Sequence, residues 1–196
     1  DQVMDDQALL VYGMNGQPLE PQHGYPLRLL VPGWYGMTSV KWLRRIEAVS
    51  QRFDGHYMDG TYRYRDTIEV AGEPVTHQRI RSLMAPPGVP DFYFRKRMVE
   101  AGKHRLVGRA WAGPKKVVKV EVSTDGGKSW APAQVEPAGA ACCWQGWSFD
   151  WQATPGETTL AVRATDEDGN TQPDEPIWNI HGMGNNAVQM VDVIVR

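Results

Sequence analysis

The chain is poor in cysteine. Its 196 residues include only two, Cys142 and Cys143, and these are adjacent. A vicinal pair rarely closes a disulfide, because the small ring distorts the peptide, and the spacing is not that of a metal finger. We therefore predict two buried, reduced thiols, with a redox role as the minority alternative.

Long apolar runs and an excess of one charge are also missing. No apolar run approaches the roughly 18 residues that cross a bilayer, so we predict no membrane span. With 21 basic and 23 acidic residues the net charge is −2. Because nucleic-acid binders usually carry a basic excess or stripe, we predict no nucleic-acid partner, while a local anion site stays possible.

The first residues show no basic-then-apolar leader. The chain opens with Asp1 and not with Met, which is consistent with removal of an upstream portion. The missing leader therefore does not exclude export.

Strands and tight turns dominate the first third of the chain. The apolar run Ala8–Met14 ends at Asn15-Gly16, a strong signal for a type I′ hairpin turn. Leu27–Val31 predicts a buried strand, and Trp42–Val49 a further extended segment. About sixty residues are near the limit for an independent core, so we expect an apolar face that this part does not cover.

From about Gly102 the pattern becomes a series of short strands with period-2 alternation and no amphipathic helix. Such spacing predicts a two-sheet β-sandwich of the immunoglobulin type. The alternating apolar positions are Val118, Val120, Val122, Trp147, Phe149, Trp151, Leu160, Val162 and Ala164. The predicted fold class is mainly β, with a β-rich segment over residues 1–64, a connector over 65–100 and the sandwich over 101–196.

A histidine and two cations lie in or near the predicted strand at Leu27–Val31: His23 precedes it, Arg28 belongs to it and Lys41 follows it. Arg28 offers a planar fork of donors that suits phosphate oxygens, and Lys41 a compact positive charge. The loop Gly36–Ser39 adds backbone N–H groups and hydroxyls, which favour an anion site. The alternative is ordinary surface chemistry, with Lys41 solvated, Arg28 paired with an acid and His23 bonded to a loop carbonyl.

The stretch HGYPLRLLVPGWYGMTSVKWL, from His23 to Leu43, closely resembles the molybdopterin-binding segment of the sulfite oxidase family. The preceding LLVYGMNGQPLEPQ resembles the same family. The resemblance implies that residues 1–64 are the C-terminal portion of a molybdopterin-binding domain. It also implies that the molybdenum-molybdopterin cofactor and its terminal phosphate are held by His23, Arg28, Ser39, Val40 and Lys41.

Tyr62 lies 21 residues after Lys41. In sulfite oxidases a tyrosine at this distance reaches the oxo and hydroxo ligands of the metal, so the resemblance implies a catalytic role for Tyr62. Tyr64 is the rival if the loop differs by two residues. Packing with an exposed hydroxyl is the alternative for either ring.

Two C-terminal stretches resemble the family's dimerisation domain: GRAWAGPKKVVKVEVSTDGGKSW and PIWNIHGMGNNAVQMVDVIV. Many sulfite oxidases place a substrate-binding arginine in the loop that Lys115 and Lys116 occupy here. Lysine keeps the charge but loses the bidentate fork, which weakens the assignment of sulfite as substrate. Trp178, Asn179 and Asn186 are interpreted as structural.

The resemblance implies part of a molybdenum oxidoreductase that transfers an oxygen atom to or from a small oxyanion such as sulfite. It further implies a homodimer formed through the sandwich and a haem or cytochrome electron acceptor. The family ligates molybdenum through a cysteine upstream of the matched pattern, so this chain supplies no metal ligand and needs an upstream segment to complete the cofactor site. The family is found in several compartments, and a periplasmic location is favoured if the protein is bacterial.

Two other functions are compatible with the residues. The sandwich could serve only as a non-catalytic dimerisation or interaction module. The many tryptophans also suggest a carbohydrate-binding sandwich, although strand alternation places several of them in a core.

Overall fold

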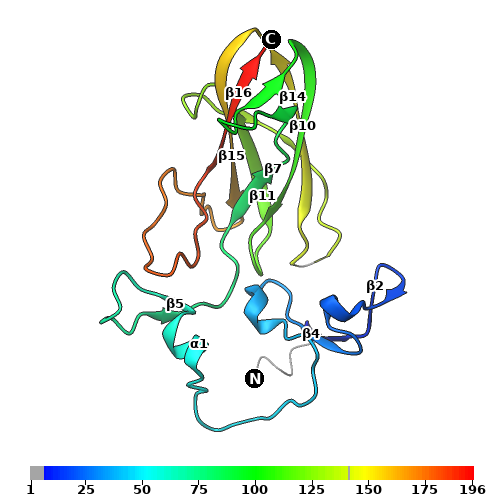
Figure 1. Cartoon of the computed structure of the whole chain (residues 1–196), viewed down its shortest axis with the longest axis vertical. Helices are drawn as coiled ribbons and strands as arrows, with labels where there is room; N and C mark the ends of the chain where they lie inside the picture. Colours follow the sequence, from blue (N-terminus) through cyan, green and yellow to red (C-terminus); the bar gives the residue numbers. More distant parts are fainter. Residues whose placement is uncertain (1–6, 141) are drawn as a thin grey trace. The chain divides into compact units, whose positions relative to one another are not determined.

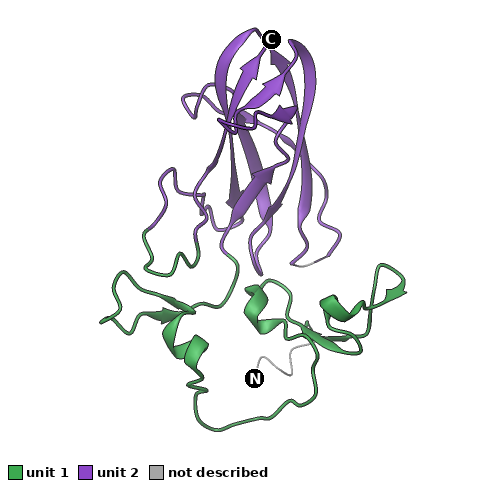
Figure 2. Cartoon of the chain, viewed as in Figure 1, with its two compact units in different colours: residues 1–78, 178–184 green, residues 79–177, 185–196 purple. Residues whose placement is uncertain are grey.

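The structure is a computed structural model that describes residues 7–140 and 142–196, and it is built mainly from strands (Figure 1). The chain divides into two compact units (Figure 2). Unit 1 comprises residues 1–78 and 178–184, and unit 2 comprises residues 79–177 and 185–196. The prediction of a mainly β protein is confirmed.

Unit 2 is a sandwich of a four-stranded and a six-stranded sheet. Within the sheets all pairs are antiparallel except β16 with β9, which is parallel. The smaller sheet has the order β13 (Gln134–Val135), β14 (Gln145–Ala153), β10 (Gly102–Trp111), β7 (Arg81–Met84). The larger has the order β12 (Ala131–Pro132), β11 (Val117–Ser123), β15 (Gly156–Asp166), β16 (Gln189–Val195), β9 (Arg97–Val99), β8 (Val89–Pro90).

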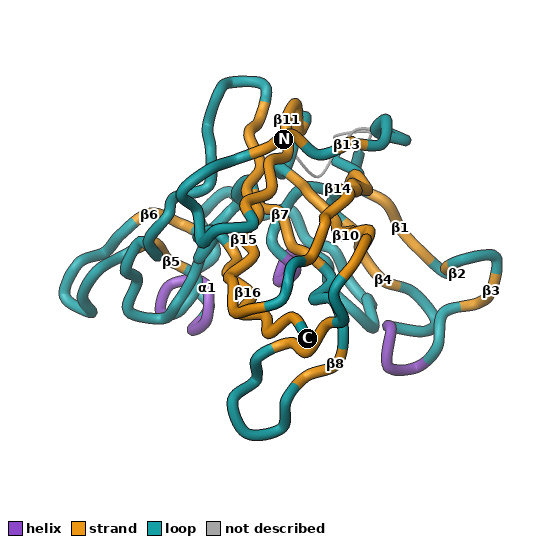
Figure 3. Tube along the Cα trace, turned by 90° about the horizontal axis from the view of Figure 1, so that it is seen from above, coloured by secondary structure: helices purple, strands orange, loops and turns teal. Residues whose placement is uncertain are grey.

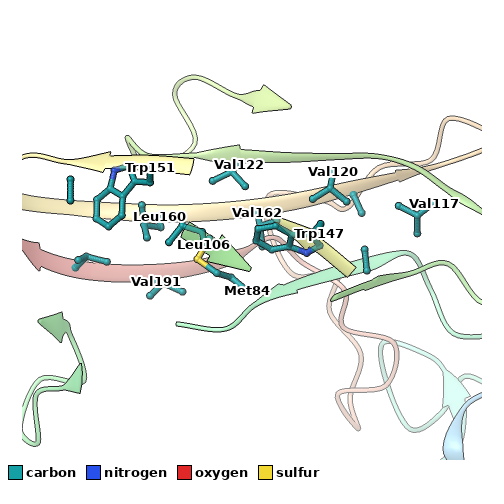
Figure 4. Close-up of a cluster of buried hydrophobic side chains, with 14 of the residues drawn as sticks. Met84, Leu106, Val117, Val120, Val122, Trp147, Trp151, Leu160, Val162 and Val191 are labelled. Atoms are coloured by element: carbon teal, nitrogen blue, oxygen red, sulfur yellow. The ribbon is translucent and has the colours of Figure 1, made fainter. Parts of the chain in front are cut away.

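The core of unit 2 lies between these two sheets (Figure 4). Alternate residues point inward over most of the predicted pattern: Leu106 and Trp147 come from the smaller sheet, Val120, Leu160 and Val162 from the larger. Val118 is an exception and is exposed, because the strand register shifts between Val117 and Lys119 and Val117 is buried in its place. Each such side chain stabilises the fold by about 1.5–3 kcal/mol through burial. The interior use of Trp147 removes one candidate for a sugar-binding platform.

In its described residues, unit 1 contains three two-stranded sheets and three short helices, in the lower part of Figure 1. The pairs are β1 (Leu9–Val11) with β4 (Arg28–Leu30), β2 (Gly13–Met14) with β3 (Gln17–Pro18), and β5 (Arg63–Tyr64) with β6 (Glu73–Pro74). The helices are η2 (Pro21–His23), η3 (Gly36–Thr38) and α1 (His56–Gly60). Asn15 and Gly16 have φ of 53° and 76°, so the predicted hairpin turn is confirmed.

Two strand predictions in unit 1 need correction. The strand expected at Leu27–Val31 exists as β4, but its side chains are half-buried or exposed, because in the described part of the chain β4 pairs with β1 alone. The strand expected at Trp42–Val49 does not form. Trp42 has a φ of 53°, which interrupts an extended backbone.

The expectation of an uncovered apolar face in the first sixty residues is confirmed. In the described part of unit 1, the buried hydrophobic side chains are Leu19 and Val75. Among the first sixty residues, the large apolar side chains that remain exposed are Leu9, Leu10, Tyr12, Met14, Tyr25, Leu30, Val40, Trp42, Ile46, Val49, Phe53 and Tyr57.

The segment predicted as a connector contains three strands of the sandwich. β7, β8 and β9 all fall within residues 65–100 and pair with strands of unit 2. Their pairing is long-range: Gly108 of β10, for instance, lies opposite Met84 of β7. Local amino-acid composition does not reveal pairing between strands that are distant in the sequence.

The prediction of two buried thiols is wrong. Cys142 is half-buried and Cys143 exposed, and neither is part of a disulfide. Both lie in the loop between β13 and β14, outside the strands of the sandwich. Their apolar character alone therefore did not determine their burial.

The turn after β11 is closed by side-chain hydrogen bonds. Asp125 accepts from the backbone N–H of Ser129 at 2.9 Å and from its hydroxyl at 2.5 Å, while Ser123 donates to the same carboxylate at 2.7 Å. These bonds, with those from Ser129 the largest, lower the pKa of Asp125 from 3.8 to about 2. The ionised carboxylate thus holds the Gly126–Gly127 turn.

We expect Asp125→Ala to lower the melting temperature of unit 2 at neutral pH, because it removes the acceptor that closes this turn. A carboxyl whose folded pKa is depressed stabilises the fold above its unfolded pKa, and that contribution is lost as the pH falls toward the folded value. The difference from wild type should therefore shrink between pH 3.8 and about 2. Thermal unfolding followed by circular dichroism measures it. Asp150→Ala, at an exposed position of β14, is the control and should show no such pH dependence.

Candidate functional site

The predicted cofactor residues meet around β4. η2 ends at His23, β4 begins at Arg28, and the chain beyond η3 returns beside β4. Two backbone bonds fix that return: Leu29 N–H donates to the Val40 carbonyl at 2.9 Å, and Leu43 N–H to the Leu27 carbonyl at 2.8 Å. This arrangement brings Lys41 next to the strand that carries Arg28.

Gly24 lies between the two cations at the level of the backbone. Its φ is 109°, and a Cβ built on it would lie 3.1 Å from the Cβ of Arg28 and 3.1 Å from the Cβ of Lys41. A side chain at this position would be strained and crowded. Because Gly24 has no side chain, the Cβ atoms of Arg28 and Lys41 can both lie close to its backbone. We call His23, Arg28, Lys41 and the intervening Ser39–Val40 loop the cationic cluster.

Carbonyl oxygens, and not carboxylates, hold the cations of this cluster. Arg28 donates from Nη1 to the His23 carbonyl at 3.1 Å and from Nη2 to the Ser39 carbonyl at 3.3 Å. Lys41 Nζ donates to the Gln22 carbonyl at 2.9 Å. In the described residues no carboxylate forms an ion pair with either cation. Both charges are thus placed without being neutralised, and the acid partner considered for Arg28 is not found.

The other members of the cationic cluster, His23, Ser39 and Val40, make different contacts. The side chain of His23 is exposed, and its carbonyl accepts from Arg28. Ser39 Oγ accepts from the Val31 N–H at 3.2 Å, which fixes the loop against the end of β4. Val40 is exposed and contributes through its carbonyl. The structure therefore brings all five predicted cofactor residues into one local arrangement.

Tyr62 lies between α1 and the β5–β6 hairpin. Its backbone N–H donates to the Tyr57 carbonyl at 2.9 Å, and its carbonyl accepts from Val75 N–H at 3.0 Å. The ring of Tyr62 is half-buried, as is that of Tyr64 in β5. The backbone position of Tyr62 is thus fixed from both sides.

A short backbone ladder links the Tyr62 segment to the loop that precedes η3. Just after Val75, Thr76 accepts from Tyr35 N–H at 2.9 Å, and Gln78 N–H donates to the Gly33 carbonyl at 2.8 Å. The Trp34 and His77 rings pack with their centroids 4.7 Å apart. The segment 75–78 therefore connects Tyr62 with the chain that leads into the cationic cluster.

Arg63 is a residue of this region that the sequence reasoning missed. It is 6% exposed, and its guanidinium donates to the carbonyls of Ala71 and Gly72. Asn179 Nδ2 donates to the Arg63 carbonyl at 2.9 Å. The Tyr-Arg-Tyr-Arg alternation after Thr61 could have shown that Arg63 points away from the face of Tyr62 and Tyr64.

The residues interpreted as structural form backbone links. Asn179 also accepts from the N–H groups of His181 and Met183 at 2.9 and 3.0 Å. Trp178 Nε1 donates to the Asp66 carbonyl at 3.0 Å, and Asn186 Nδ2 to the Ile80 carbonyl at 3.1 Å. These bonds join segments more than a hundred residues apart in the chain.

The predicted substrate residues belong to unit 2, in the loop between β10 and β11. Lys115 Nζ lies 2.5 Å from Asp168 Oδ2 and 3.9 Å from Asp166 Oδ2, and the bond to Asp168 raises the pKa of Lys115. Lys116 bonds Glu167 through its backbone on both sides. The Lys115 ammonium is therefore already paired with an acid, unlike Arg28 and Lys41.

In the described part of the chain, no three His, Cys, Asp or Glu side chains gather as a metal site would require. Among the same residues no helix is long and apolar enough to cross a membrane.

Two family models match the chain. Residues 1–57 match the oxidoreductase molybdopterin binding domain, and residues 93–196 match the Mo-co oxidoreductase dimerisation domain. The second match alone covers more than half of the chain.

Individual relatives agree with the models. Nitrate reductase [NADH] 1 of Arabidopsis thaliana is 34% identical over 200 residues, which cover 91% of this chain and 22% of that protein. Nitrate reductase [NAD(P)H] of Hordeum vulgare is 33% identical over 206 residues, with 92% and 23% covered. Among solved structures, the sulfane dehydrogenase SoxCD of Paracoccus pantotrophus superposes with a TM-score of 0.83 at 29% identity.

The superposition covers 96% of this chain and 49% of the solved one, so the chain spans about half of that relative and under a quarter of the nitrate reductases. Both matched domains occur in the expected order along the sequence. The chain belongs to the sulfite oxidase family of molybdopterin oxidoreductases, with residues of the cofactor-binding domain followed by the dimerisation domain.

Proposed function

We propose that the protein carrying this chain is a molybdenum oxidoreductase that transfers an oxygen atom to or from a small oxyanion, such as sulfite. In this proposal unit 1 binds part of the molybdopterin cofactor, and unit 2 forms a homodimer. The observation that supports it most is the cationic cluster, where Arg28 and Lys41 both lie against Gly24 and, among the described residues, neither forms an ion pair with a carboxylate.

The donor set of the cluster fits a phosphorylated cofactor. Arg28 Nε is buried, and within the described residues it has no hydrogen-bond partner. Such an orphaned donor is costly unless a ligand satisfies it. A guanidinium and an ammonium both offer charge-assisted bonds that phosphate oxygens accept well. Arg28 and Lys41 would hold the terminal phosphate, with His23 and the Ser39–Val40 loop beside it.

When bound, the cofactor supplies the oxygen-atom transfer and the two-electron redox chemistry, while the protein supplies position and charge. Arg28 and Lys41 fix the position of the cofactor through its phosphate. The carbonyls of His23, Ser39 and Gln22 keep these two cations oriented. A cysteine ligand for the metal has no counterpart among the residues of unit 1, so the cofactor site requires a further segment of the protein.

Tyr62 is proposed as the residue that donates a hydrogen bond at the metal centre. Its backbone is bonded to both Tyr57 and Val75, so the ring starts from a fixed point. A phenol O–H can donate a hydrogen bond to an oxygen ligand or substrate. Tyr64 remains the alternative.

Lys115 and Lys116 are proposed to contact the oxyanion substrate. A lysine at this place keeps the attraction for an anion without a bidentate fork. The ion pair between Lys115 and Asp168 competes with that role, so an anion would have to displace the carboxylate. The named activities of the relatives, nitrate reductase and sulfane dehydrogenase, show that the family accepts different substrates.

A haem or cytochrome acceptor and a periplasmic location, if the protein is bacterial, complete the proposal. The second candidate function is a non-catalytic dimerisation module. The large dimerisation-domain match and the self-contained core of unit 2 favour it. Copurified molybdenum and pterin fluorescence distinguish the two: a full-length preparation that carries a cysteine-bearing cofactor segment but lacks both would end the enzymatic proposal.

Arg28→Ala should reduce the molybdenum and pterin content of the full-length protein several-fold, because a phosphate contact is lost. Turnover per bound molybdenum should change little, since the arginine holds the cofactor and takes no part in the chemistry. Metal analysis and pterin fluorescence measure the content. Arg105→Ala, an exposed arginine of β10, is the control and should retain the full cofactor content. Unchanged metal content in the Arg28 variant would refute this assignment.

Gly24→Ala should destabilise the chain by more than about 1 kcal/mol, because alanine strains a positive φ and crowds the Cβ atoms of Arg28 and Lys41. It should also lower the cofactor content of the full-length protein. Denaturant unfolding and metal analysis are the measurements. Gly60→Ala is the matched control, since a Cβ there meets open space and the residue lies outside the cationic cluster. Equal behaviour of the two variants would show that the close approach at Gly24 is unimportant.

Tyr62→Phe should leave the molybdenum content unchanged and lower turnover about 10²-fold or more, in line with the loss of a positioned proton donor. Tyr64→Phe is the matched variant and should keep nearly full turnover. Steady-state kinetics normalised to molybdenum decide between them. The reverse result would transfer the role to Tyr64.

A further inference from the structure

The tip of the β8–β9 hairpin exposes three consecutive aromatic residues. β8 and β9 pair antiparallel, and residues 91–96 form the connection. Phe92 is 91% exposed, Tyr93 84% and Phe94 78%. Figure 3 shows the loop beside β8 projecting beyond the strands of unit 2. Such a concentration of exposed rings on one turn is typical of an interaction site.

Hydrogen bonds organise this tip. The Asp91 carboxylate accepts from the backbone N–H groups of Tyr93 and Phe94, at 2.9 and 2.8 Å. Asp91 N–H donates to the Lys96 carbonyl at 2.8 Å, which closes the loop. The Phe92 and Tyr93 rings pack edge to face with centroids 5.5 Å apart. A partner would therefore meet an ordered turn, which lowers the entropy cost of binding.

The base of the hairpin is anchored to the sandwich. The Arg97 guanidinium donates to the carbonyls of Pro87 at 2.8 Å and Pro86 at 3.2 Å. Lys96 Nζ lies 2.7 Å from Glu157 Oε2 at the start of β15. Arg97 and Lys96 thus bind the base of the hairpin to the sandwich, whereas the three rings at its tip are exposed to solvent.

An apolar row continues from this hairpin along the outer face of the larger sheet. Val89 of β8 lies opposite Met98 of β9, which lies opposite Ile194 of β16. Their neighbours Val99 and Val193 point into the core, so alternation puts the row on the outside. Val89 is exposed, and Met98 and Ile194 are half-buried.

We propose that Phe92, Tyr93 and Phe94 are the hot spot by which a second copy of this chain docks. This inference rests on the dimer of the proposed function and specifies its contact. Tyr93 and Phe94 fall within the dimerisation-domain match, residues 93–196. The three residues carry no charge, so the surface suits an apolar partner and not a polyelectrolyte.

The area that these rings could bury is close to the area of a stable dimer interface. An aromatic side chain buries about 150–250 Å², so three rings from each of two copies would bury roughly 900–1,500 Å². Stable interfaces bury about 1,200–2,000 Å² in total. In a two-fold dimer each copy contributes the same patch, so the hairpin and the adjoining apolar row account for most of the required area.

The test uses the 196-residue chain and the triple variant Phe92→Ser, Tyr93→Ser, Phe94→Ser. Sedimentation equilibrium over a dilution series gives the dimer dissociation constant of each. The variant should dimerise at least about a hundredfold more weakly, because hot-spot aromatics dominate binding energy. Its thermal unfolding should match that of wild type when both are monomeric, since the rings are exposed.

The matched control replaces two exposed rings of unit 1, Phe53→Ser with Tyr57→Ser, which lie outside the dimerisation match. It should dimerise as wild type does. A second measurement is hydrogen–deuterium exchange: peptides covering residues 91–96 should exchange more slowly in the wild-type dimer than in the dilute monomer.

The outcomes separate the two proposals. A triple variant that dimerises with wild-type affinity, or a 91–96 segment that exchanges equally in monomer and dimer, overturns the hot spot and leaves the dimer standing. A wild-type chain that stays monomeric at every concentration refutes dimerisation itself and the hot spot with it.

Discussion

The apolar layer between the two sheets of unit 2 is the interaction on which the rest of this structure depends. Leu106, Trp147, Val120 and Leu160 are almost fully removed from water there. Strand alternation places them on one face and leaves the other face for charged and polar residues. The turns and loops at the ends of these strands, including the aromatic hairpin tip and the Lys115 loop, take their positions from this layer.

Unit 1 obtains its order differently, from backbone and side-chain hydrogen bonds more than from burial. Leu19 and Val75 are its buried hydrophobic residues in the described chain, while Arg28, Lys41 and Arg63 each donate to backbone carbonyls. Carbonyl acceptors orient a cation without cancelling its charge, whereas a carboxylate would cancel it. This difference separates the cationic cluster from Lys115, whose ammonium is paired with Asp168.

Local patterns predicted local structure well. The Asn15-Gly16 turn and the alternating strands of the sandwich follow from rules that act within a few residues. The resemblance over His23 to Leu43 indicated which residues would meet, and the structure brings them together. Burial was harder to predict: β4 carries two leucines and both cysteines are apolar, yet the exposure of these side chains depends on whether another element covers them.

The sequence by itself determined the mainly β class, the family and the residue types of the cationic cluster. Periodicity, turn chemistry and an extended motif each depend on residues that are close together in the sequence. Only the tertiary structure decided that β7 to β9 join the sandwich, that Arg63 is buried and that three rings at residues 92–94 stand exposed. The physical reason is that burial and strand pairing depend on segments far apart in the chain. Side chains of equal hydrophobicity, such as Leu106 and Phe92, are buried or exposed according to what packs over them.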